Sequence, residues 1–301
     1  MRCVITGGAG FIGSHLADSL LFQGHEATVI DDLSSGKREY VNEKASFIKK
    51  DIRKELTAEF QGADTIFHLA ADPDVRSNSR DPKKSFDINV MGTISVLEAC
   101  RKADVPRFVF ASTSAVYGET DILPTPETAP CSPISEYGAS KLACEAYASC
   151  YSALYGIRST SFRLANIFGE RSSHGVIPDF YNKLKDNPDQ LEILGDGKQD
   201  KSYLHISDCI SGMLAAWKTQ QATYEVYNIG SKDKTTVDGI AQKISSYLSL
   251  HPKLIHTGTK RGWPGDVPLM LLDTKKLGSI GWRQQLSFDD GLKRYLEWLA
   301  A

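Results

Sequence analysis

The sequence predicts an α/β protein built on a doubly wound parallel sheet, with a smaller α/β region for substrate in its C-terminal part. Two observations indicate this fold. Short apolar runs alternate with amphipathic helical patterns through the first half of the chain, as expected for a parallel sheet with helices on both faces. A glycine-rich turn also stands between the first apolar run and the first helical pattern, at residues 6–13.

The elements follow in order along the chain. The predicted strands are Cys3–Thr6, Glu26–Ile30, Ser46–Lys49, Thr65–Leu69, Arg107–Ser112 and Arg158–Arg163. The predicted helices are Ile12–Gln23, Ser85–Ala103 and Ala139–Tyr155. This alternation fits βαβ units with right-handed crossovers.

After about residue 166 the pattern changes, because strands become sparser and Gly and Pro more frequent. We therefore expect a nucleotide-binding domain over residues 1–165 and a smaller domain for the substrate over residues 166–301. Later segments of the chain are expected to return to the first sheet.

Composition excludes several classes of function. The 301 residues carry a formal net charge of −2, so no basic field indicates nucleic acid as a partner. No apolar run approaches the roughly 20 residues of a membrane helix, and the N-terminus lacks a signal-peptide pattern. The six cysteines are scattered without a CxxC pair, which favours reduced thiols in a cytoplasmic protein and no metal site.

The glycine-rich turn has the dinucleotide-binding spacing, Gly-x-x-Gly-x-x-Gly at Gly7, Gly10 and Gly13. Glycines let the backbone approach a pyrophosphate, and the following helix supplies free N–H groups and a positive dipole end. These features predict a Rossmann-type cofactor domain.

Asp31 ends the next strand, about 20 residues beyond the loop, where a carboxylate binds a ribose 2′-hydroxyl and repels a 2′-phosphate. The sequence therefore favours NAD over NADP, although Lys37 and Arg38 leave room for NADP. Asp51 ends the third strand and is either an adenine contact or a helix cap.

The candidate catalytic residues are Ser114, Tyr137 and Lys141. Tyr137 and Lys141 lie four residues apart on a predicted helix and so share one face. A phenol is a poor base at neutral pH, and a nearby ammonium is expected to lower its pKa. Tyr137 could then take a proton from a sugar hydroxyl while Ser114 hydrogen-bonds the same oxygen.

With these residues in place, the chain resembles the extended short-chain dehydrogenases and, within them, the UDP-glucose 4-epimerase group. The resemblance extends over nearly the whole chain and includes His68-Leu69-Ala70-Ala71, Asn89 and Asn166-Ile167-Phe168-Gly169. It implies NAD as cofactor, a UDP-sugar as substrate and a homodimer formed through the helices near Ser85–Ala103 and Ala139–Tyr155.

The same resemblance implies two sets of contacts. The cofactor side comprises Gly7, Gly10, Phe11, Ile12, Gly13, Asp31, Asp32, Asp51, Ile52, Leu69, Ala70, Ala71, Asn89, Tyr137 and Lys141. The substrate side comprises Ser114, Tyr137, Asn166, Lys201, Arg261 and Asp266. Many relatives have Arg at the Lys201 position, and lysine lacks the bidentate fork for phosphate. Arg261 also lies further from Asp266 than in the best-known epimerases.

The resemblance leaves the reaction open among epimerases, dehydratases, decarboxylases and reductases. In the dehydratases and decarboxylases of the family, an acidic residue follows the Ser/Thr pair at this strand end, whereas this chain has Ala115. The simplest remaining reaction is 4-epimerisation through a 4-keto sugar, with UDP-glucose and UDP-galactose as the expected pair. UDP-glucuronate chemistry, net reduction and a non-catalytic binding protein are the alternatives. Met270 matches a family position beside the carbon-2 substituent, or it is a core residue.

Overall fold

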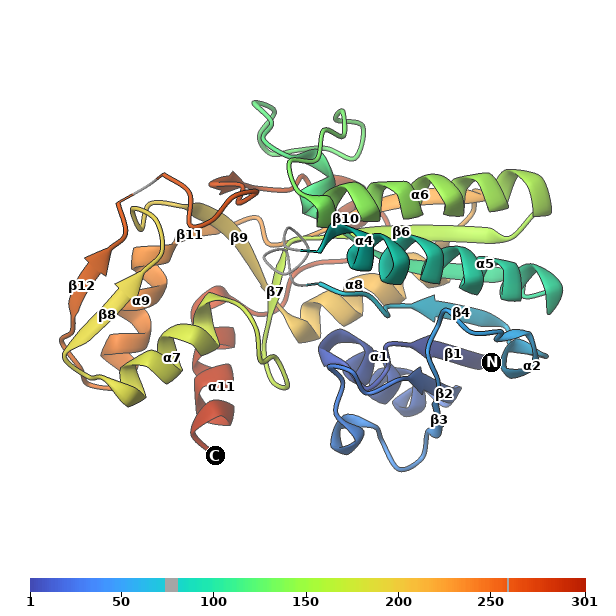
Figure 1. Ribbon diagram of the computed structural model, residues 1–301, viewed down its shortest axis with the longest axis horizontal. Coiled ribbons are helices and arrows are strands. Elements are labelled where there is room, and N and C mark those ends of the chain that lie inside the picture. The colour runs from blue at the N-terminus through green and yellow to red at the C-terminus, as the bar shows by residue number, and fades with distance from the viewer. Residues whose placement is uncertain (74–80, 259) are drawn as a thin grey trace.

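The computed structural model describes residues 1–73, 81–258 and 260–301. A seven-stranded parallel sheet runs through the larger part, with strand order β10-β6-β5-β4-β1-β2-β3 (Figure 1). Its strands are β1 (Arg2–Thr6), β2 (Glu26–Asp31), β3 (Ser46–Lys49), β4 (Thr65–His68), β5 (Arg107–Thr113), β6 (Arg158–Leu164) and β10 (Tyr224–Ile229). The predicted fold class and six predicted strands are confirmed, each within one residue at either end.

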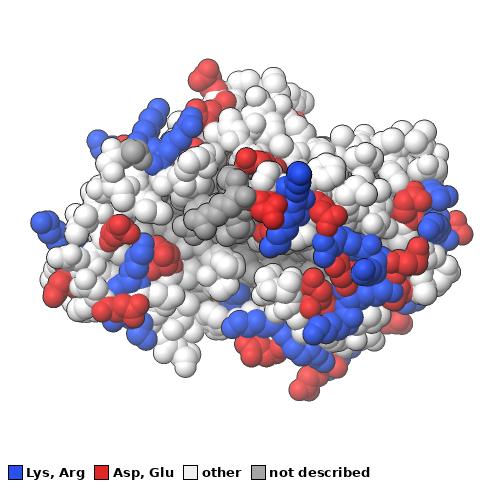
Figure 2. Space-filling view, viewed as in Figure 1, with Lys and Arg blue, Asp and Glu red and all other residues white. Residues whose placement is uncertain are grey.

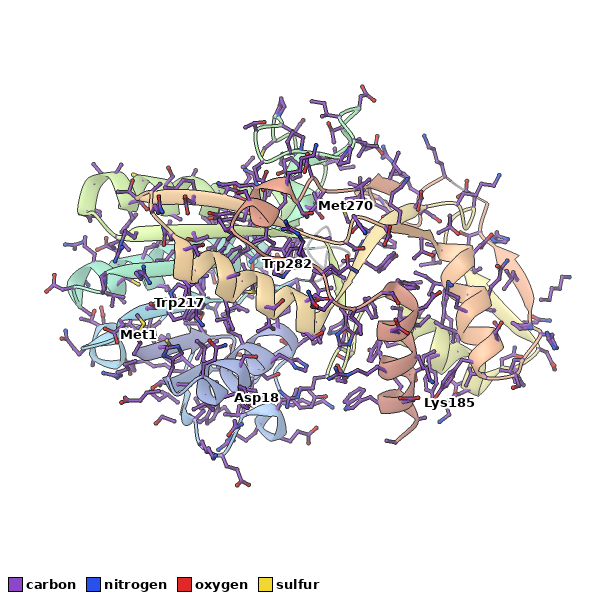
Figure 3. The ribbon with its side chains drawn as sticks, turned by 180° about the vertical axis from the view of Figure 1, so that it is seen from behind. Met1, Asp18, Lys185, Trp217, Met270 and Trp282 are labelled. Atoms are coloured by element: carbon purple, nitrogen blue, oxygen red, sulfur yellow. The ribbon has the colours of Figure 1, made fainter. Side chains whose placement is uncertain are left out.

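Helices cover both faces of this sheet. α1 (Phe11–Phe22) and α8 (Ile206–Thr219) pack on one face, and α5 (Gly92–Lys102) and α6 (Glu136–Tyr155) on the other (Figure 1). Side chains of successive strand residues point to opposite faces, so Val4 belongs to one core and Ile5 to the other. Trp217 of α8 fills the first core, where its indole N–H donates to Thr65 Oγ1 at 3.3 Å (Figure 3).

The helix predicted over Ser85–Ala103 is present but not uniform. It comprises α4 (Pro82–Ser85), the π-helical segment η2 (Phe86–Met91) and α5 in direct succession. A π-helical turn is rare and frequently marks a functional site. Here it contains Asn89, whose backbone carbonyl accepts hydrogen bonds from two side chains, Thr93 Oγ1 at 2.6 Å and Cys144 Sγ at 3.2 Å.

The smaller part has its own sheets and core. β7 (Asn166–Phe168), β9 (Asp200–His205), β11 (Lys234–Thr236) and β13 (Leu269–Met270) form one sheet, and β8 (Gln190–Ile193) pairs with β12 (Lys253–His256). α7 (Val176–Asp186), α9 (Val237–Tyr247) and α11 (Phe288–Ala300) enclose a separate apolar cluster (Figure 1). The remaining short elements are η1 (Arg38–Tyr40), α2 (Thr57–Phe60), η3 (Ser114–Tyr117) and α10 (Lys275–Ser279).

Chain order and spatial order differ in this region. β10 joins the edge of the seven-stranded sheet beside β6, although it follows β7, β8 and β9 in the sequence. The predicted domain boundary at residue 165 stays a prediction. The two parts do not separate at one point of the chain, because β10 returns to the large sheet.

Surface charges on the face shown in Figure 2 are intermingled, with basic and acidic side chains side by side. Among the described residues, no helix is both long and apolar enough to cross a bilayer. All six cysteines lie in the described part of the chain and are free thiols.

Candidate active site

Three adjacent strands of the large sheet converge on the candidate site. β4 lies between β1 and β5, so the carboxyl ends of all three open at one edge. The glycine loop follows β1, Leu69 and Ala70 follow β4, and Ser114 follows β5. Ligands of open α/β sheets bind at this edge.

The glycine loop leaves no room for larger side chains. Gly7 has φ +70°, and a Cβ built there would lie 2.5 Å from the backbone nitrogen of Ala70. A Cβ on Gly13 would lie 2.2 Å from the carbonyl oxygen of Gly7. Gly10 begins α1 with no side-chain cap, so Phe11 and Ile12 place their backbone amides in an uncapped first turn. This arrangement fits the pyrophosphate of a dinucleotide.

Asp31 lies beside the glycine loop and is nearly buried. Its carboxylate accepts the backbone N–H groups of Ala9 at 3.0 Å and Leu33 at 2.8 Å. Burial raises the pKa of Asp31, and these two hydrogen bonds oppose the shift. Each carboxylate oxygen keeps a second lone pair for a ribose hydroxyl. The neighbouring Asp32 caps the following turn through Ser34 N at 2.8 Å.

Lys37 and Arg38, the residues that left room for NADP, have other partners. Lys37 pairs with Glu39 at 3.5 Å, and the guanidinium of Arg38 stacks 4.7 Å from the ring centre of Phe47. Neither contact holds a cation beside Asp31, which supports the assignment of Asp31 as the residue that disfavours a 2′-phosphate.

We expect Asp31→Ala to weaken the preference for NAD over NADP. Removing the carboxylate removes both the ribose hydrogen bonds and the repulsion of a 2′-phosphate. Titration of the cofactor-free protein with each dinucleotide measures the ratio of the two Kd values. Glu26→Ala, an exposed carboxylate at the opposite end of β2, is the matched control, with a ratio close to that of the wild type. Equal affinity of the wild-type protein for NAD and NADP would contradict the role of Asp31.

Asp51 caps a turn, which agrees in part with the helix-cap alternative predicted for it. It stabilises the turn after β3 by accepting Arg53 N at 2.9 Å and pairs with the Arg53 guanidinium at 2.6 Å. Hydrogen bonds from Arg53 lower the pKa of Asp51. Arg53 also reaches Asp87 of η2 at 2.5 Å, and Ile52 is buried against Gly92. A contact of Asp51 and Ile52 with adenine stays a prediction.

His68 links three elements on the cofactor side of the site. Its ring contacts Thr6 Oγ1 at 2.7 Å and Thr93 Oγ1 at 2.9 Å, which ties β1 and α5 to β4. Complete burial lowers the pKa of His68 to about 3, so the imidazole stays neutral at physiological pH. The turn that follows, Leu69-Ala70-Ala71, is thereby held against Gly7.

Asn89 supports the catalytic helix. Its side chain accepts Asp72 N at 2.8 Å and donates to Ser140 Oγ at 3.1 Å, and Ser140 Oγ donates to the carbonyl of Tyr137 at 2.8 Å. Asn89 thus links the end of β4 to the first turn of α6. The resemblance implies this supporting role, and the hydrogen bonds are consistent with it.

Lys141 and Tyr137 lie on the same face of α6. Lys141 is 3% exposed and donates to the carbonyl of Ala111 at 2.8 Å, while its ammonium lies 5.9 Å from the centre of the Tyr137 ring. Burial lowers the pKa of Lys141 to about 8, so the ammonium form predominates at neutral pH.

We expected a lowered pKa for the Tyr137 phenol, but in the chain alone this pKa is raised. Burial raises the pKa of the phenol, and the nearby Cys144 and Asp72 act in the same direction. The prediction from sequence counted the ammonium of Lys141 but not the loss of water around the ring.

Ser114 approaches Tyr137 through the close packing of η3 on α6. Gly138, the residue after Tyr137, has so little space that a Cβ there would lie 2.7 Å from the carbonyl oxygen of Ala115. Ser135 caps α6 by accepting Gly138 N at 3.1 Å. The tight contact places the residue after Ser114 directly against the residue after Tyr137, so the two segments that carry the catalytic candidates pack together.

The substrate-side residues are brought together only in part. Asn166 donates to the carbonyl of Ser202 at 3.2 Å, beside Lys201. The Lys201 ammonium forms a buried ion pair with Asp266, while its Nζ lies 5.4 Å from the centre of the Trp263 ring. The resemblance to the family did not predict this ion pair, because the pair depends on the alignment of β13 with β9.

Arg261 lies in the same loop as Asp266 but pairs elsewhere. Its guanidinium forms an ion pair with Glu119, two residues after η3, at 2.8 Å. Both side chains are 46% exposed. Gly262 N donates to Asp266 Oδ2 at 3.0 Å and fixes the loop between them. A diphosphate role for Arg261 and Lys201 stays a prediction.

Met270 is buried rather than openly exposed to a pocket. It is 9% exposed and shares an apolar cluster with Val116, Tyr117, Ala165 and Leu272 (Figure 3). The cluster reaches η3, two residues beyond Ser114. These contacts favour the core-residue alternative, although the position remains close to the catalytic group.

Two residues near the site were missed from the sequence, Trp263 and Gly138. Gly138 follows Tyr137 directly and lies in the first turn of α6, which begins at Glu136, three residues before the predicted start at Ala139. Trp263 gave no signal beyond its aromatic character, because its contact with Lys201 joins β9 to a distant loop.

Comparison with known proteins identifies the family of the chain. Residues 3–230 match the model of the NAD dependent epimerase/dehydratase family. A Methanocaldococcus jannaschii protein, provisionally described as a UDP-glucose 4-epimerase, is 36% identical over 98% of this chain and 97% of its own. A UDP-N-acetyl-α-D-glucosaminuronate decarboxylase of Bacillus cytotoxicus is 32% identical, over 99% and 97%. A crystal structure of a UDP-galactose 4-epimerase is 42% identical with a TM-score of 0.92, over 100% and 99%.

Proposed function

The chain belongs to the NAD-dependent epimerase/dehydratase family, and we propose that it is a 4-epimerase that interconverts UDP-glucose and UDP-galactose. The observation that carries this proposal is the packing of η3, which begins with Ser114 and Ala115, against the first turn of α6, where Lys141 lies beside Tyr137. The three polar groups suit removal and return of a hydroxyl proton. Alanine offers no acid or base for a further elimination.

The chain's own residues divide the work of the reaction. NAD bound at this edge of the sheet would supply reversible hydride transfer at carbon 4 of the sugar. The glycine loop and Asp31 hold the dinucleotide at the edge of the sheet. Tyr137 takes the proton of the 4-hydroxyl and later gives it back, and Ser114 hydrogen-bonds the same oxygen. Lys141 holds a positive charge behind the phenol.

The proposed substrate residues come from the smaller part of the chain. Asn166, Lys201 and Arg261 are proposed to contact the nucleotide diphosphate, with Asp266 setting the position of Lys201. A 4-keto sugar formed by oxidation must present its other face before the proton and hydride return. The residues that hold the diphosphate can stay in place while the sugar turns.

The test begins with the purified protein and no added cofactor. Conversion of UDP-galactose to UDP-glucose without net formation of NADH supports the epimerase. Mass spectrometry after denaturation identifies any bound dinucleotide and sugar nucleotide. The same assay with the N-acetylated UDP-sugars establishes the substrate range. Net consumption of NADH would indicate a reductase, and bound NAD without turnover of any UDP-sugar would indicate a non-catalytic binding protein.

A UDP-glucuronate decarboxylase or epimerase is the second candidate, favoured by the similarity to the Bacillus cytotoxicus decarboxylase. Release of CO2 from UDP-glucuronate distinguishes decarboxylation from epimerisation in one measurement. Ala115 at the strand end makes the epimerase the better-supported proposal.

A homodimer through α5 and α6 is part of the proposal. Large apolar side chains are exposed on η2, which leads into α5, and on α6, namely Phe86 at 53%, Met91 at 43%, Tyr147 at 41% and Leu154 at 66%. Tyr147 and Leu154 are seven residues apart and share one face of α6. An exposed apolar patch on packed helices is typical of a subunit interface. A cytoplasmic location is also proposed, since all six cysteines are free thiols.

Leu154→Glu should convert the dimer to a monomer, because it places a charge in the apolar surface of α6. Light scattering measures the mass, expected to fall from about twice the chain mass to the chain mass of 33.1 kDa. Phe22→Glu is the matched control, since Phe22 is 93% exposed on α1 and should leave the mass unchanged. A monomeric wild type would contradict the proposed interface.

A further inference from the structure

A buried ion pair lies directly behind the catalytic residues. Glu145 of α6 and Arg163 of β6 are 3% and 6% exposed, with Arg163 Nη2 2.7 Å from Glu145 Oε2. Arg163 Nε lies 3.1 and 3.2 Å from the two carboxylate oxygens. The guanidinium therefore binds the carboxylate in a bidentate arrangement, which is the strongest geometry for this kind of ion pair.

The pair belongs to a polar row that crosses the sheet. In the parallel register, Ser112 of β5 and Asn228 of β10 are the Cα partners of Arg163 on its two sides. Ser112 Oγ donates to Glu145 Oε1 at 2.5 Å. Three neighbouring strands thus present polar side chains at the same level of the sheet, under α6.

Each end of the pair reaches a segment with a catalytic residue. Glu145 stands one helical turn after Lys141, on the same side of α6. Ser112 stands two residues before Ser114, and the carbonyl of Ala111 next to it accepts Lys141 Nζ at 2.8 Å. Glu145 and Ser112 therefore bridge the helix that holds Tyr137 and Lys141 to the strand end that holds Ser114.

The row also fixes η3 from the other side. Arg163 Nη1 donates to the hydroxyl of Tyr117 at 3.0 Å, and that hydroxyl donates to Asn228 Oδ1 at 2.8 Å. Burial raises the pKa of Tyr117 to about 12, so the hydroxyl keeps its proton. Asn228 Nδ2 in turn donates to the carbonyls of Thr125 and Asp273 at 2.9 and 3.0 Å. The network thus holds η3 at Tyr117 and holds the strand that leads into η3 at Ser112.

We propose that Glu145 and Arg163 are positioning residues, whose ion pair, through Ser112 and Tyr117, sets the distance between Ser114 on η3 and Tyr137 on α6. This inference rests on the proposed epimerase function. Taking two charges out of water is unfavourable, and replacing such a pair by apolar residues is often neutral for stability. The contacts of this pair with both catalytic segments supply a different reason for its presence. A shift of about 1 Å between reacting groups can lower a rate by roughly a hundredfold.

Ser112→Ala tests the proposal without leaving a buried charge unpaired. It removes the bond between the strand end and Glu145 but keeps the ion pair. We expect kcat on UDP-galactose to fall roughly ten- to a hundredfold, with KM within about twofold of the wild type. The melting temperature and the NAD content should change little.

Ser161→Ala is the matched control. Ser161 lies on β6 two residues before Arg163, is equally buried, and accepts a hydrogen bond from Tyr224 at 3.2 Å. Loss of the Ser161 hydroxyl should leave kcat within about twofold of the wild type, because this hydroxyl has no hydrogen bond to a segment with a catalytic residue. Tyr117→Phe, compared with Tyr224→Phe, repeats the test on the η3 side.

Two outcomes would overturn the positioning role. One is an unchanged kcat in Ser112→Ala, and the other is an equal loss of kcat and melting temperature in Ser112→Ala and Ser161→Ala. The wild type serves as reference in each experiment. A wild type that turns over no UDP-sugar contradicts the proposed function instead, so the two failures are distinguishable.

Discussion

Tyr137→Phe is expected to lower kcat by roughly a hundred- to ten-thousandfold, because general acid–base groups contribute about that much. The substitution keeps the ring that packs at the start of α6 and removes only the hydroxyl. NAD should remain bound, since the glycine loop and Asp31 are untouched. Steady-state turnover of UDP-galactose and the NAD released on denaturation are the two measurements.

Tyr155→Phe, at the far end of the same helix, is the control for this experiment. Tyr155 is half-exposed and lies away from the strand ends, so its hydroxyl should not affect the reaction. Activity of Tyr137→Phe within a few-fold of the wild type would remove Tyr137 from the mechanism.

Lys141→Met should lower the rate and move the acid limb of the pH–rate profile to higher pH. Burial raises the pKa of the Tyr137 phenol, and a positive charge nearby stabilises the phenolate. An opposite charge at close range commonly shifts a pKa by roughly 1–3 units, so the rate at neutral pH should fall about ten- to a thousandfold.

The direction of this shift follows from the charge of each group. Lys141 has a pKa lowered to about 8, so its ammonium is present below that pH and is lost above it. Without the ammonium, the phenol releases its proton only at higher pH. Lys141→Arg keeps a positive charge and should recover part of the rate. A pH–rate profile of Lys141→Met that coincides with the wild type would contradict the role.

The first half of the fold could be predicted because its signals are local. Alternation of apolar runs and helical patterns identified β1 to β6, and the spacing of Gly7, Gly10 and Gly13 identified the turn after β1. The order of the strands in the sheet could not be read this way. β10 returns to the sheet beside β6 after three intervening strands, and no nearby residue indicates that pairing.

The site shows the same division. Spacing along one helix placed Tyr137 and Lys141 together, and the glycine loop followed by an acidic strand end indicated NAD. The rise that burial causes in the Tyr137 pKa could not be predicted from spacing, because desolvation depends on all the atoms packed around the ring. The ion pairs of Lys201 with Asp266 and of Arg261 with Glu119 join residues 65 and 142 positions apart.

The sequence by itself therefore determined the residue types for the chemistry and the local elements that hold them, since both depend on neighbours within a few positions. Only the tertiary structure decided which charges are already paired and how the catalytic segments are held together. Ser112, Arg163 and Asn228 form one row because three strands align in a particular register. That register is set by packing across the whole sheet, and separations of tens of residues leave no periodic trace in the sequence.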